Sequence, residues 1–537
     1  MRKALTYLFL IVAGYFLFFH GTGGCGLFDV DEAVYAGVSM EMMKNGSFIV
    51  PTYNGLPFYE KPVLYYWTTA VFYKLFGVSE ITARIPGGVF AVLMVLGTWY
   101  FVRRMFNSRT ALLSAVILST NVEMLILSKS AVMDTMFVFF VTGCLVSFAL
   151  AFFNEKKGGY MAVYLFAALA VLTKGPAGIV LPGVIIFIFL LLAGEVSKVK
   201  RLLNVPGIII FLVTALPWYV LVSVASGGDF LKEFFMYHNV ARFTRSFEGH
   251  SGTVFYYLGV ILLGFYPWSA FLPAGITGAV KSLMKDKKNL FLIVWMVIPF
   301  VFFSISYTKL PNYALPIFPP MSVLVAVWWN KYIDGNNNGP LVTIHLVIFS
   351  VISIFWAGLF TFSRTLADMV RARFNLPYMA EPATFGISFK VLAAGFVLFL
   401  IIVFILEKFR RREYSIAVLA MGMFLFNYAL TDYVIPVLWQ YTQGGLHRIS
   451  TGLRHKLNDG SILVIYELRH PSINFYTRSR AEILTREEKA RFEHILSHGK
   501  INNKRIYIIS GAKLKQGMPA EIKVLQESGG YVLLSNM

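Results

Sequence analysis

The chain has 537 residues, of which 57% are hydrophobic and only 14% are charged. This composition excludes an ordinary soluble enzyme, and repeated apolar runs long enough to cross roughly 30 Å of hydrocarbon indicate a polytopic α-helical membrane protein. The net charge of +20 comes from basic residues between the apolar runs. The positive-inside rule and anionic lipid head groups account for such residues, so we expect contact with membrane lipids and no nucleic-acid partner.

The first apolar run, residues 5–19, follows Arg2 and Lys3. No cleavage site of the Ala-x-Ala kind follows it, so we expect a first transmembrane helix rather than a signal peptide. Further runs centre near Val92, Leu118, Phe140, Tyr164, Ile186, Leu212, Val260, Trp295, Val323, Ser350, Phe396 and Ala420. The sequence therefore predicts about 13 transmembrane helices, all within residues 1–435.

Every second loop between these runs is basic, in register with the Arg2/Lys3 terminus. The N-terminus is therefore expected in the cytoplasm, and an odd number of helices places the C-terminus outside. The long outward loop 21–83 contains DEAVYAGVSMEMMKNG, a helical pattern stopped by Asn45 and Gly46. Because this pattern has too few apolar residues to span, we expect short helices along the membrane surface.

The composition changes after about residue 433. SILVIYEL, KRIYIIS and YVLLSN are typical of strands, whereas TREEKARFEHILSHG is typical of a helix. Residues 440–537 are therefore predicted to form a small α/β domain outside the membrane.

The outward loops also carry acids, lysines and histidines from distant parts of the chain. The main candidates are Asp31, Glu32, Glu60, Lys61, Asp134, Lys174, Arg242, His250 and Lys309. Convergence at one membrane face is typical of a site at the mouth of a bundle.

Several of these residues have structural explanations. Asp31 is suited to cap a helix that begins at Glu32, and Lys61 is suited to reach lipid phosphates. The TKGP segment fits a tight turn between helices, and His250 fits an ordinary polar loop. Asp134 is harder to explain, because it lies between apolar runs with no other carboxylate near, where an ionised side chain is costly without a partner or function.

The stretch FDVDEAVYAGVSMEMMKNGSFIVPTYNGLPFYEKPVLYYW resembles the first loop of bacterial lipid-linked glycosyltransferases of the GT-C type. These form the superfamily of aminoarabinose transferases and protein O-mannosyltransferases. The resemblance continues through VMDTM, LTKGP, LPWY, HNVARF, the His250 loop and SYTKLPNYALP. It implies a helical membrane domain, juxtamembrane helices and an outer α/β domain. It also implies sugar transfer from polyprenyl (undecaprenyl) phosphate to a glycolipid such as lipid A, at the periplasmic face of the bacterial inner membrane.

The resemblance also implies roles for individual residues. Lys61 would bind the donor phosphate, Asp31 would orient or deprotonate the acceptor, and Asp134 would position a sugar hydroxyl or Lys61. The residues expected to contact substrate are Glu32, Lys174, Arg242, Lys309 and Tyr313. Glu60 and His250 would bind a divalent metal such as zinc, with His250 favoured over His238 by its spacing before FYY.

One position departs from the family pattern, because Val34 replaces the arginine of the usual DEARYA or DETRYA motif. An arginine would suit an anionic substrate group, so the transfer of aminoarabinose itself to lipid A is placed in doubt. Transfer to protein hydroxyls, as by the O-mannosyltransferases, stays open. So does transport of a lipid-linked sugar, although transporters tend to show internal repeats and polar residues near mid-membrane, which are not found here. The sequence does not name the sugar, the acceptor, the carrier length or the oligomeric state.

Overall fold

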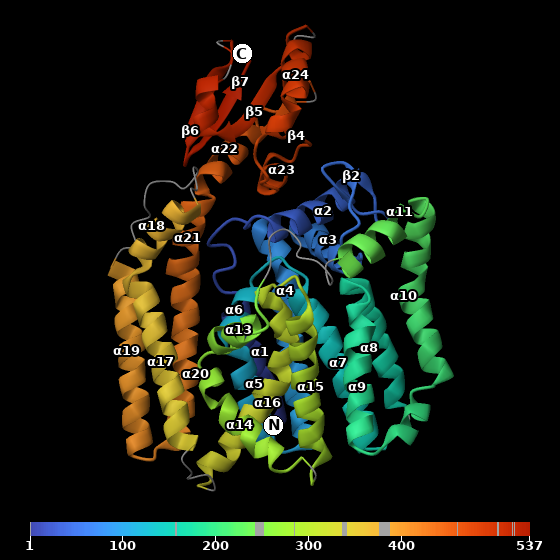
Figure 1. Cartoon of the computed structure of the whole chain (residues 1–537), viewed down its shortest axis with the longest axis vertical. Coiled ribbons are helices and arrows are strands. Elements are labelled where there is room, and N and C mark those ends of the chain that lie inside the picture. Colours follow the sequence, from blue (N-terminus) through green and yellow to red (C-terminus); the bar gives the residue numbers. More distant parts are fainter. Residues whose placement is uncertain are drawn as a thin grey trace.

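A bundle of helices with a mixed α/β domain above one end makes up the chain in a computed structural model (Figure 1). The structure describes residues 2–155, 158–241, 252–283, 285–335, 341–374, 387–458, 460–501, 504–517, 519 and 521–536. The N-terminus lies at the end of the bundle opposite the α/β domain (Figure 1).

Each of the predicted apolar runs forms a helix. The helices at the predicted centres are α1 (Arg2–Phe18), α4 (Glu80–Met105), α5 (Ser108–Ser119), α7 (Asp134–Phe153), α8 (Gly159–Lys174), α9 (Ala177–Leu192), α10 (Val205–Ala225), α13 (Tyr256–Gly264), α15 (Lys287–Ile305), α16 (Phe318–Ile333), α17 (Leu341–Thr361), α19 (Ile387–Lys408) and α20 (Arg412–Ala429). The multi-pass helical class is therefore confirmed.

Not all of these helices are equally long. Within the described residues, seven helical segments are long and apolar enough to span a membrane, the last of them running from Arg412 to Thr442. A bent pair, α13 with Trp268–Val280 (η3, Trp268–Phe271, and α14, Leu272–Val280), turns by 113°, and the number is eight if this pair counts as one span. Four further apolar helices have 10–17 residues. Because each residue adds about 1.5 Å, these fall short of a full hydrocarbon core, and a total of 13 spans stays a prediction.

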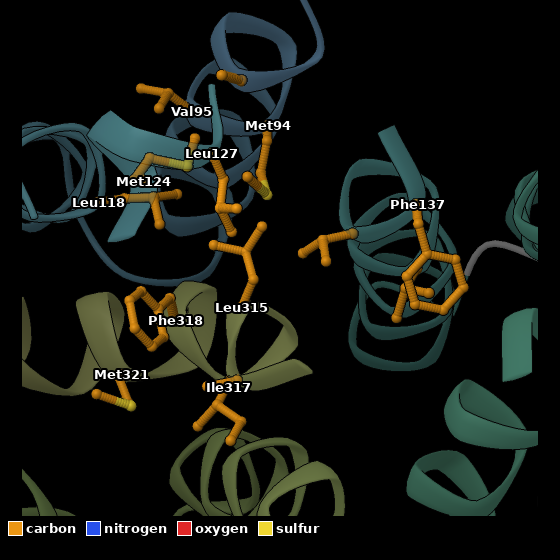
Figure 2. Packing of buried hydrophobic residues seen from close by; sticks show 14 of the residues in the cluster. Met94, Val95, Leu118, Met124, Leu127, Phe137, Leu315, Ile317, Phe318 and Met321 are labelled. Carbon is orange, nitrogen blue, oxygen red and sulfur yellow. The ribbon is translucent and has the colours of Figure 1, made fainter. Parts of the chain in front are cut away.

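The bundle is held by a continuous apolar core. Figure 2 shows Met94 of α4 and Leu127 of α6 (Val122–Leu127) gathering with Leu315 of η4 (Pro311–Ile317). Met94 and Leu315 are fully buried, and Phe318 at the start of α16 packs beside them. This packing fixes the short elements α6 and η4 against the long helices, and both lie next to the site described below.

The first outward loop folds into α2 (Asp31–Asn45), a hairpin of β1 (Thr52–Tyr53) and β2 (Leu56–Pro57), and α3 (Leu64–Phe76). Gly46, with a φ of 69°, ends α2 in the left-handed conformation, as the Asn45-Gly46 pair predicts. Asn54 and Gly55, with φ values of 54° and 79°, form the two-residue turn typical of a tight hairpin. The loop does form short helices, and α2 and α3 lie between the bundle and the α/β domain (Figure 1). Their position along the membrane surface stays a prediction.

The remaining elements before the C-terminal domain are short. They are η1 (Val196–Arg201), α11 (Asp229–Leu231), η2 (Lys232–Ala241), α18 (Ser363–Phe374), η5 (Leu430–Val434) and α21 (Ile435–Thr442). Trp218 on α10 donates its indole hydrogen to the carbonyl of Ile49, 3.0 Å away. The α10 end of the bundle is thereby tied to the first loop.

The C-terminal domain is a five-stranded sheet in the order β4-β3-β5-β7-β6, with β3 parallel to β4 and β5 and the other pairs antiparallel. The predicted strands are confirmed as β3 (Ile462–Tyr466), β5 (Ile506–Gly511) and β7 (Tyr531–Ser535), and the predicted helix as η6 (Arg486–Glu488) with α24 (Lys489–Ile501). The elements not predicted are α22 (Gly444–Arg454), α23 (Ser472–Thr477), β4 (Glu482–Leu484), η7 (Ala512–Gly517) and β6 (Lys523–Ser528). Both missed strands are edge strands, one of only three residues and one largely exposed, so neither has a clear apolar pattern.

The basic loops meet at the end of the bundle that holds the N-terminus. Lys287 Nζ lies 2.6 Å from a carboxylate oxygen of Glu195, and Arg109 lies 2.7 Å from Asp334 and 3.2 Å from Glu413. Five connecting regions that are far apart in sequence therefore share one end of the molecule, as the alternation of basic loops predicts.

Candidate active site

Three acids at the start of the first loop have different surroundings. The side chains of Asp29 and Glu32 are 4% and 7% exposed, whereas Asp31 is exposed. Helix α2 begins at Asp31 itself, and Val30 holds the N-cap position without a side-chain bond. The alternative that Asp31 caps this helix is therefore wrong.

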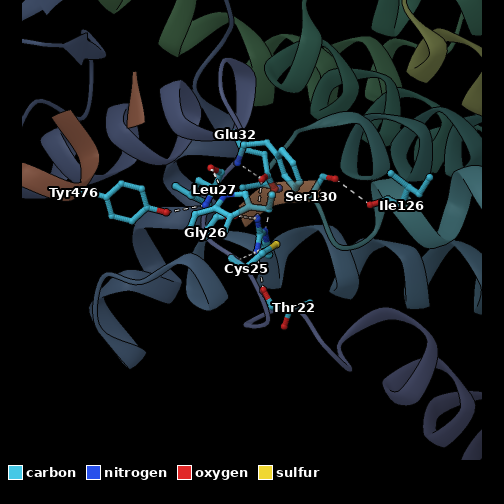
Figure 3. A network of polar contacts seen from close by, with 12 residues as sticks. Thr22, Cys25, Gly26, Leu27, Glu32, Ile126, Ser130 and Tyr476 are labelled. Carbon is cyan, nitrogen blue, oxygen red and sulfur yellow. Dashed lines mark hydrogen bonds and ion pairs between the residues drawn. The ribbon is translucent and has the colours of Figure 1, made fainter. Parts of the chain in front are cut away.

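Glu32 is the centre of a buried polar network. Arg84 of α4 donates to both of its carboxylate oxygens, at 3.0 and 2.8 Å, and the backbone amides of Ala131 and Phe28 donate at 2.6 and 2.9 Å. Arg84 also donates to the backbone carbonyls of the 22–26 segment, as Figure 3 shows around Thr22, Cys25 and Gly26. These contacts make Glu32 an anchor of the loop rather than the substrate contact that the sequence predicts.

Arg84 is a residue that sequence reasoning missed. It is 3% exposed and lies one turn inside the apolar helix α4. A lone arginine in an apolar run signals a buried partner, but nothing in the sequence shows that the partner is Glu32, 52 residues earlier.

Lys61 is buried between the hairpin and α3, with 8% of its surface exposed. Its ammonium lies 3.9 Å from the Glu60 carboxylate and donates to the Glu60 carbonyl at 3.3 Å. A lysine that only reaches outward to lipid phosphates would expose its head group. The buried position favours a binding site over the snorkelling alternative.

Tyrosines of α2 and α3 connect the acids of the site. The rings of Tyr35, Tyr65 and Tyr66 lie 6.1–6.2 Å apart. Burial, and then the negative charges of Asp31, Glu60 and Asp134 among nearby groups, raises the pKa of Tyr35 well above its ordinary value. Asp31 and Glu60 of the first loop and Asp134 of a later segment therefore all lie close enough for their charges to act on one buried tyrosine.

Asp134 and Lys174 form an ion pair at one edge of this group. Lys174 Nζ lies 2.6 Å from Asp134 Oδ1, and Asp134 is 4% exposed. The same ammonium lies 4.8 Å from the centre of the Tyr313 ring, a cation–π distance. Asp134 begins α7 and Lys174 ends α8, where Gly175, with a φ of 83°, turns the chain into α9. The TKGP segment is thus the predicted turn, and it also places the Lys174 ammonium next to Asp134.

A second carboxylate lies near Asp134, so the expectation that none does is wrong. Glu123 on α6 is partly buried and packs against Gly264 of α13. Burial, together with the charge of Asp134, raises the pKa of Glu123 to about 7. The sequence signal is a single acid within an apolar run, but the packing of α6 against α13 is not visible in the chain order.

Lys309 is buried at the end of α15. Its ammonium donates to the backbone carbonyls of Ser304, Ser306 and Phe303, and burial lowers its pKa. These carbonyls are the unpaired acceptors of a helix C-terminus. The contacts assign Lys309 to capping this helix rather than to the predicted substrate contact.

Two predicted site residues, Arg242 and His250, lie outside the described residues. Among the residues that the structure does describe, no group of three His, Cys, Asp or Glu side chains is close enough to hold a metal ion. Glu60 contributes a partly exposed carboxylate, 30% accessible. The zinc site therefore stays a prediction that depends on His250.

The chain is similar to known proteins over parts of its length. Residues 60–220 match the family model described as dolichyl-phosphate-mannose-protein mannosyltransferase. The undecaprenyl phosphate-α-4-amino-4-deoxy-L-arabinose arabinosyl transferase of Erwinia tasmaniensis is 31% identical over 306 residues, which are 56% of this chain but only 55% of that protein. An uncharacterised protein of Aquifex aeolicus is 32% identical over 62% of this chain and 74% of its own length. The chain is therefore similar, over part of its length, to the arabinosyl transferases and to the mannosyltransferase family model.

Comparison with a solved structure extends the likeness in fold to the whole chain. ArnT of Cupriavidus metallidurans, solved bound to undecaprenyl phosphate, superposes with a TM-score of 0.82 over 99% of this chain and 98% of its own, at 22% identity. That likeness covers the α/β domain as well as the bundle. Asp31, Glu60, Lys61, Asp134 and Lys174 lie at the end of the bundle that the α/β domain covers.

Proposed function

We propose that this protein transfers a sugar from a polyprenyl phosphate carrier to a glycolipid acceptor. The observation that carries the proposal is the convergence of Asp31, Glu60 and Asp134 on Tyr35, with the buried Lys61 next to Glu60. The similarity to the arabinosyl transferases supports the same reaction class.

The donor has an apolar tail that stays in lipid and a phosphate at the membrane surface. Lys61, buried and beside the Glu60 carboxylate, binds that phosphate and offsets the charge that develops on it as the sugar leaves. Lys174, held by Asp134 and Tyr313, lies at the sugar end of the site, where Asp134 accepts a hydrogen bond from a sugar hydroxyl.

Asp31 is the exposed acid of the first loop and faces the acceptor. An acceptor oxygen attacks the anomeric carbon, and the bond between this carbon and the phosphate oxygen breaks. Asp31 takes the proton of the attacking hydroxyl, and the polyprenyl phosphate leaves with the electron pair. Glu32 stays in its ion pair with Arg84 and holds Asp31 in place.

A glycolipid acceptor is favoured by geometry. Its acyl chains lie in the same leaflet as the donor tail, so both substrates reach the site laterally. The arabinosyl transferases among the relatives favour this acceptor, whereas the mannosyltransferase family model favours a protein hydroxyl. Transfer to protein is therefore the second candidate, and Val34 leaves the sugar open.

We place the protein in the bacterial inner membrane with the site facing the periplasm. The support is the cluster of basic loops at the end of the bundle opposite the site. In a background without Cys25 and Cys144, a cysteine at Lys287 should resist an impermeant thiol reagent in spheroplasts, and one at Lys513 should react. The reverse pattern would contradict the orientation.

A divalent metal such as zinc is a further part of the proposal. Glu60 and His250 would hold it, and it would supply positive charge beside the phosphate. No step above depends on it.

The test uses purified protein in nanodiscs and a panel of polyprenyl phosphate sugars. Each donor is offered with a lipid A-type glycolipid or with a peptide rich in serine and threonine, and products are identified by mass spectrometry. We expect transfer to the glycolipid and loss of transfer in Lys61→Ala. Transfer to the peptide alone would establish the protein acceptor, and flipping of the donor without any transfer would establish a transporter.

A further inference from the structure

The carboxylate of Asp29 in the first loop is buried against the C-terminal domain. Asp29 accepts hydrogen bonds from the Ser472 amide at 2.8 Å and the Ser472 hydroxyl at 2.7 Å, and its Oδ2 lies 2.9 Å from Nδ1 of His470. With its amide turned to satisfy both of its polar atoms, Gln443 also bonds the carboxylate and the backbone amide of Asp29. We call Asp29, Gln443, His470 and Ser472 the Asp29 latch.

The neighbouring residues continue the same interface. The hydroxyl oxygen of Tyr476 accepts a hydrogen bond from the backbone amide of Leu27 at 2.7 Å, and the Trp439 indole donates to the Leu27 carbonyl at 3.1 Å. On the hairpin, Asn54 bonds both the amide and the carbonyl of Ala481, each at 2.8 Å. Figure 3 shows Tyr476 reaching Leu27 beside the Glu32 network.

The latch buries a charged side chain of a surface loop. The Asp29 side chain is 4% exposed, and a buried carboxylate is costly unless its oxygens are bonded. Hydrogen bonds to a charged group are stronger than those between neutral groups, so losing one partner destabilises the interface.

The Asp29 latch lies next to the proposed catalytic acid Asp31 in the sequence. Asp31 lies two residues after Asp29 and one residue before Glu32. Glu32 is fixed to the bundle through Arg84, and Asp29 is fixed to the C-terminal domain. The exposed acid of the loop therefore lies between two immobilised acids, each held by a different part of the molecule.

We propose that the C-terminal domain is a positioning element of the catalytic site, and that it sets the place of Asp31 through the Asp29 latch. The role of Asp31 rests on the proposed function. Asp29 is a positioning residue, since its carboxylate is occupied by the domain. A displacement of about 1 Å in a reacting group lowers turnover by as much as 100-fold, so a released latch reduces kcat more than it weakens donor binding at Lys61.

The test compares Asp29→Asn and Ser472→Ala with a matched control, Asp432→Asn. Asp432 pairs with His20 at 2.8 Å and is likewise an aspartate–histidine pair between the two ends of the chain, but it lies outside the latch. For Asp29→Asn we expect kcat to fall more than tenfold while the KM for the donor changes less than threefold. Ser472→Ala, which removes one donor, should lower kcat about threefold to tenfold, and Asp432→Asn should stay within twofold of wild type.

Hydrogen exchange of residues 27–45 gives a readout that does not depend on activity. We expect faster exchange there in Asp29→Asn and Ser472→Ala than in Asp432→Asn. Unchanged exchange, or equal losses of kcat in the latch and control variants, would overturn the latch. If no donor supports transfer, the proposed function fails while exchange still decides the latch. If Asp29→Asn does not fold, Ser472→Ala carries both measurements.

Discussion

At the end of the bundle that holds the N-terminus, Arg109 pairs with Asp334 across two exposed side chains, 41% and 47% accessible. At the opposite end, Arg84 pairs with Glu32 across side chains that are 3% and 7% accessible, and Lys174 pairs with Asp134 at 16% and 5%. Both ends therefore contain ion pairs of 2.6–2.8 Å, and only their burial differs.

Burial decides what such a pair does. An exposed pair contributes about 0–1 kcal/mol, because water and salt screen it. A buried pair adds little over an apolar pair of the same size, but breaking it costs about 3–5 kcal/mol because one charge is left without a partner. The exposed charges thus orient the protein in the membrane, whereas the buried charges fix the geometry of a site.

The largest expected effect is on turnover. Lys61→Ala and Asp134→Asn should each lower kcat by about 100-fold to 1,000-fold, because each removes charge stabilisation or positioning at the reacting groups. Asp31→Ala should act similarly. Transfer in nanodiscs measures the loss, with Lys287→Ala at the exposed end as the control, expected within twofold of wild type.

Near-normal turnover of Lys61→Ala in that assay would remove the phosphate-binding role. An equal loss of turnover in Lys287→Ala would show that exposed charged residues affect turnover as much as buried ones do.

The second effect is on stability. Arg84→Met leaves the Glu32 carboxylate buried with backbone amides alone, so we expect a loss of about 3–5 kcal/mol. Arg109→Met should cost less than about 1 kcal/mol. Thermal unfolding of both variants in one detergent measures the difference, and equal melting temperatures would contradict the comparison.

Much of the fold is predictable because it follows from local pattern. Each apolar run forms a helix, the Asn45-Gly46 stop ends α2, and the three apolar strands form the centre of the C-terminal sheet. The edge strands β4 and β6 are missed because an edge strand buries little and needs no alternation.

The candidate site is predictable in its members but not in its pairings. Asp134 stands out as a lone acid, yet its partner Lys174 is 40 residues away. Glu32 and Lys309 have the residue types of a binding site, but their contacts with Arg84 and with the end of α15 are structural. The partners of Asp29 are likewise not predictable from the sequence, because they lie more than 400 residues later.

The third prediction concerns metal binding. We expect Glu60 and His250 to hold a zinc ion. Elemental analysis of purified protein should find about one zinc ion per chain, and His250→Ala should lose it. His238→Ala is the matched control and should retain it. An unchanged zinc content in His250→Ala, or no zinc in the wild-type protein, would leave Glu60 and His250 without a metal role.

The smallest expected effect is a dependence of stability on pH at Glu123. Its pKa is raised to about 7, from an ordinary carboxyl value of 4.5, by burial and by the charge of Asp134. Below pH 4.5 the folded and unfolded chains both hold this proton, so the group makes no difference. Between pH 4.5 and 7 only the folded chain holds it, so stability falls as the pH rises, and above 7 the cost is constant.

Replacing Glu123 by Gln keeps the neutral form at every pH. The melting temperature of Glu123→Gln minus that of the wild type should therefore be smallest near pH 4.5, rise toward pH 7 and level off above it. The gain corresponds to about 1–3 kcal/mol, because one pKa unit is worth about 1.4 kcal/mol and part of the side chain is accessible. Glu413→Gln at the exposed end is the control and should show no such rise. A flat difference for Glu123→Gln would mean that its carboxyl ionises as it does in water, and that this part of the site is less buried than its packing against α13 indicates.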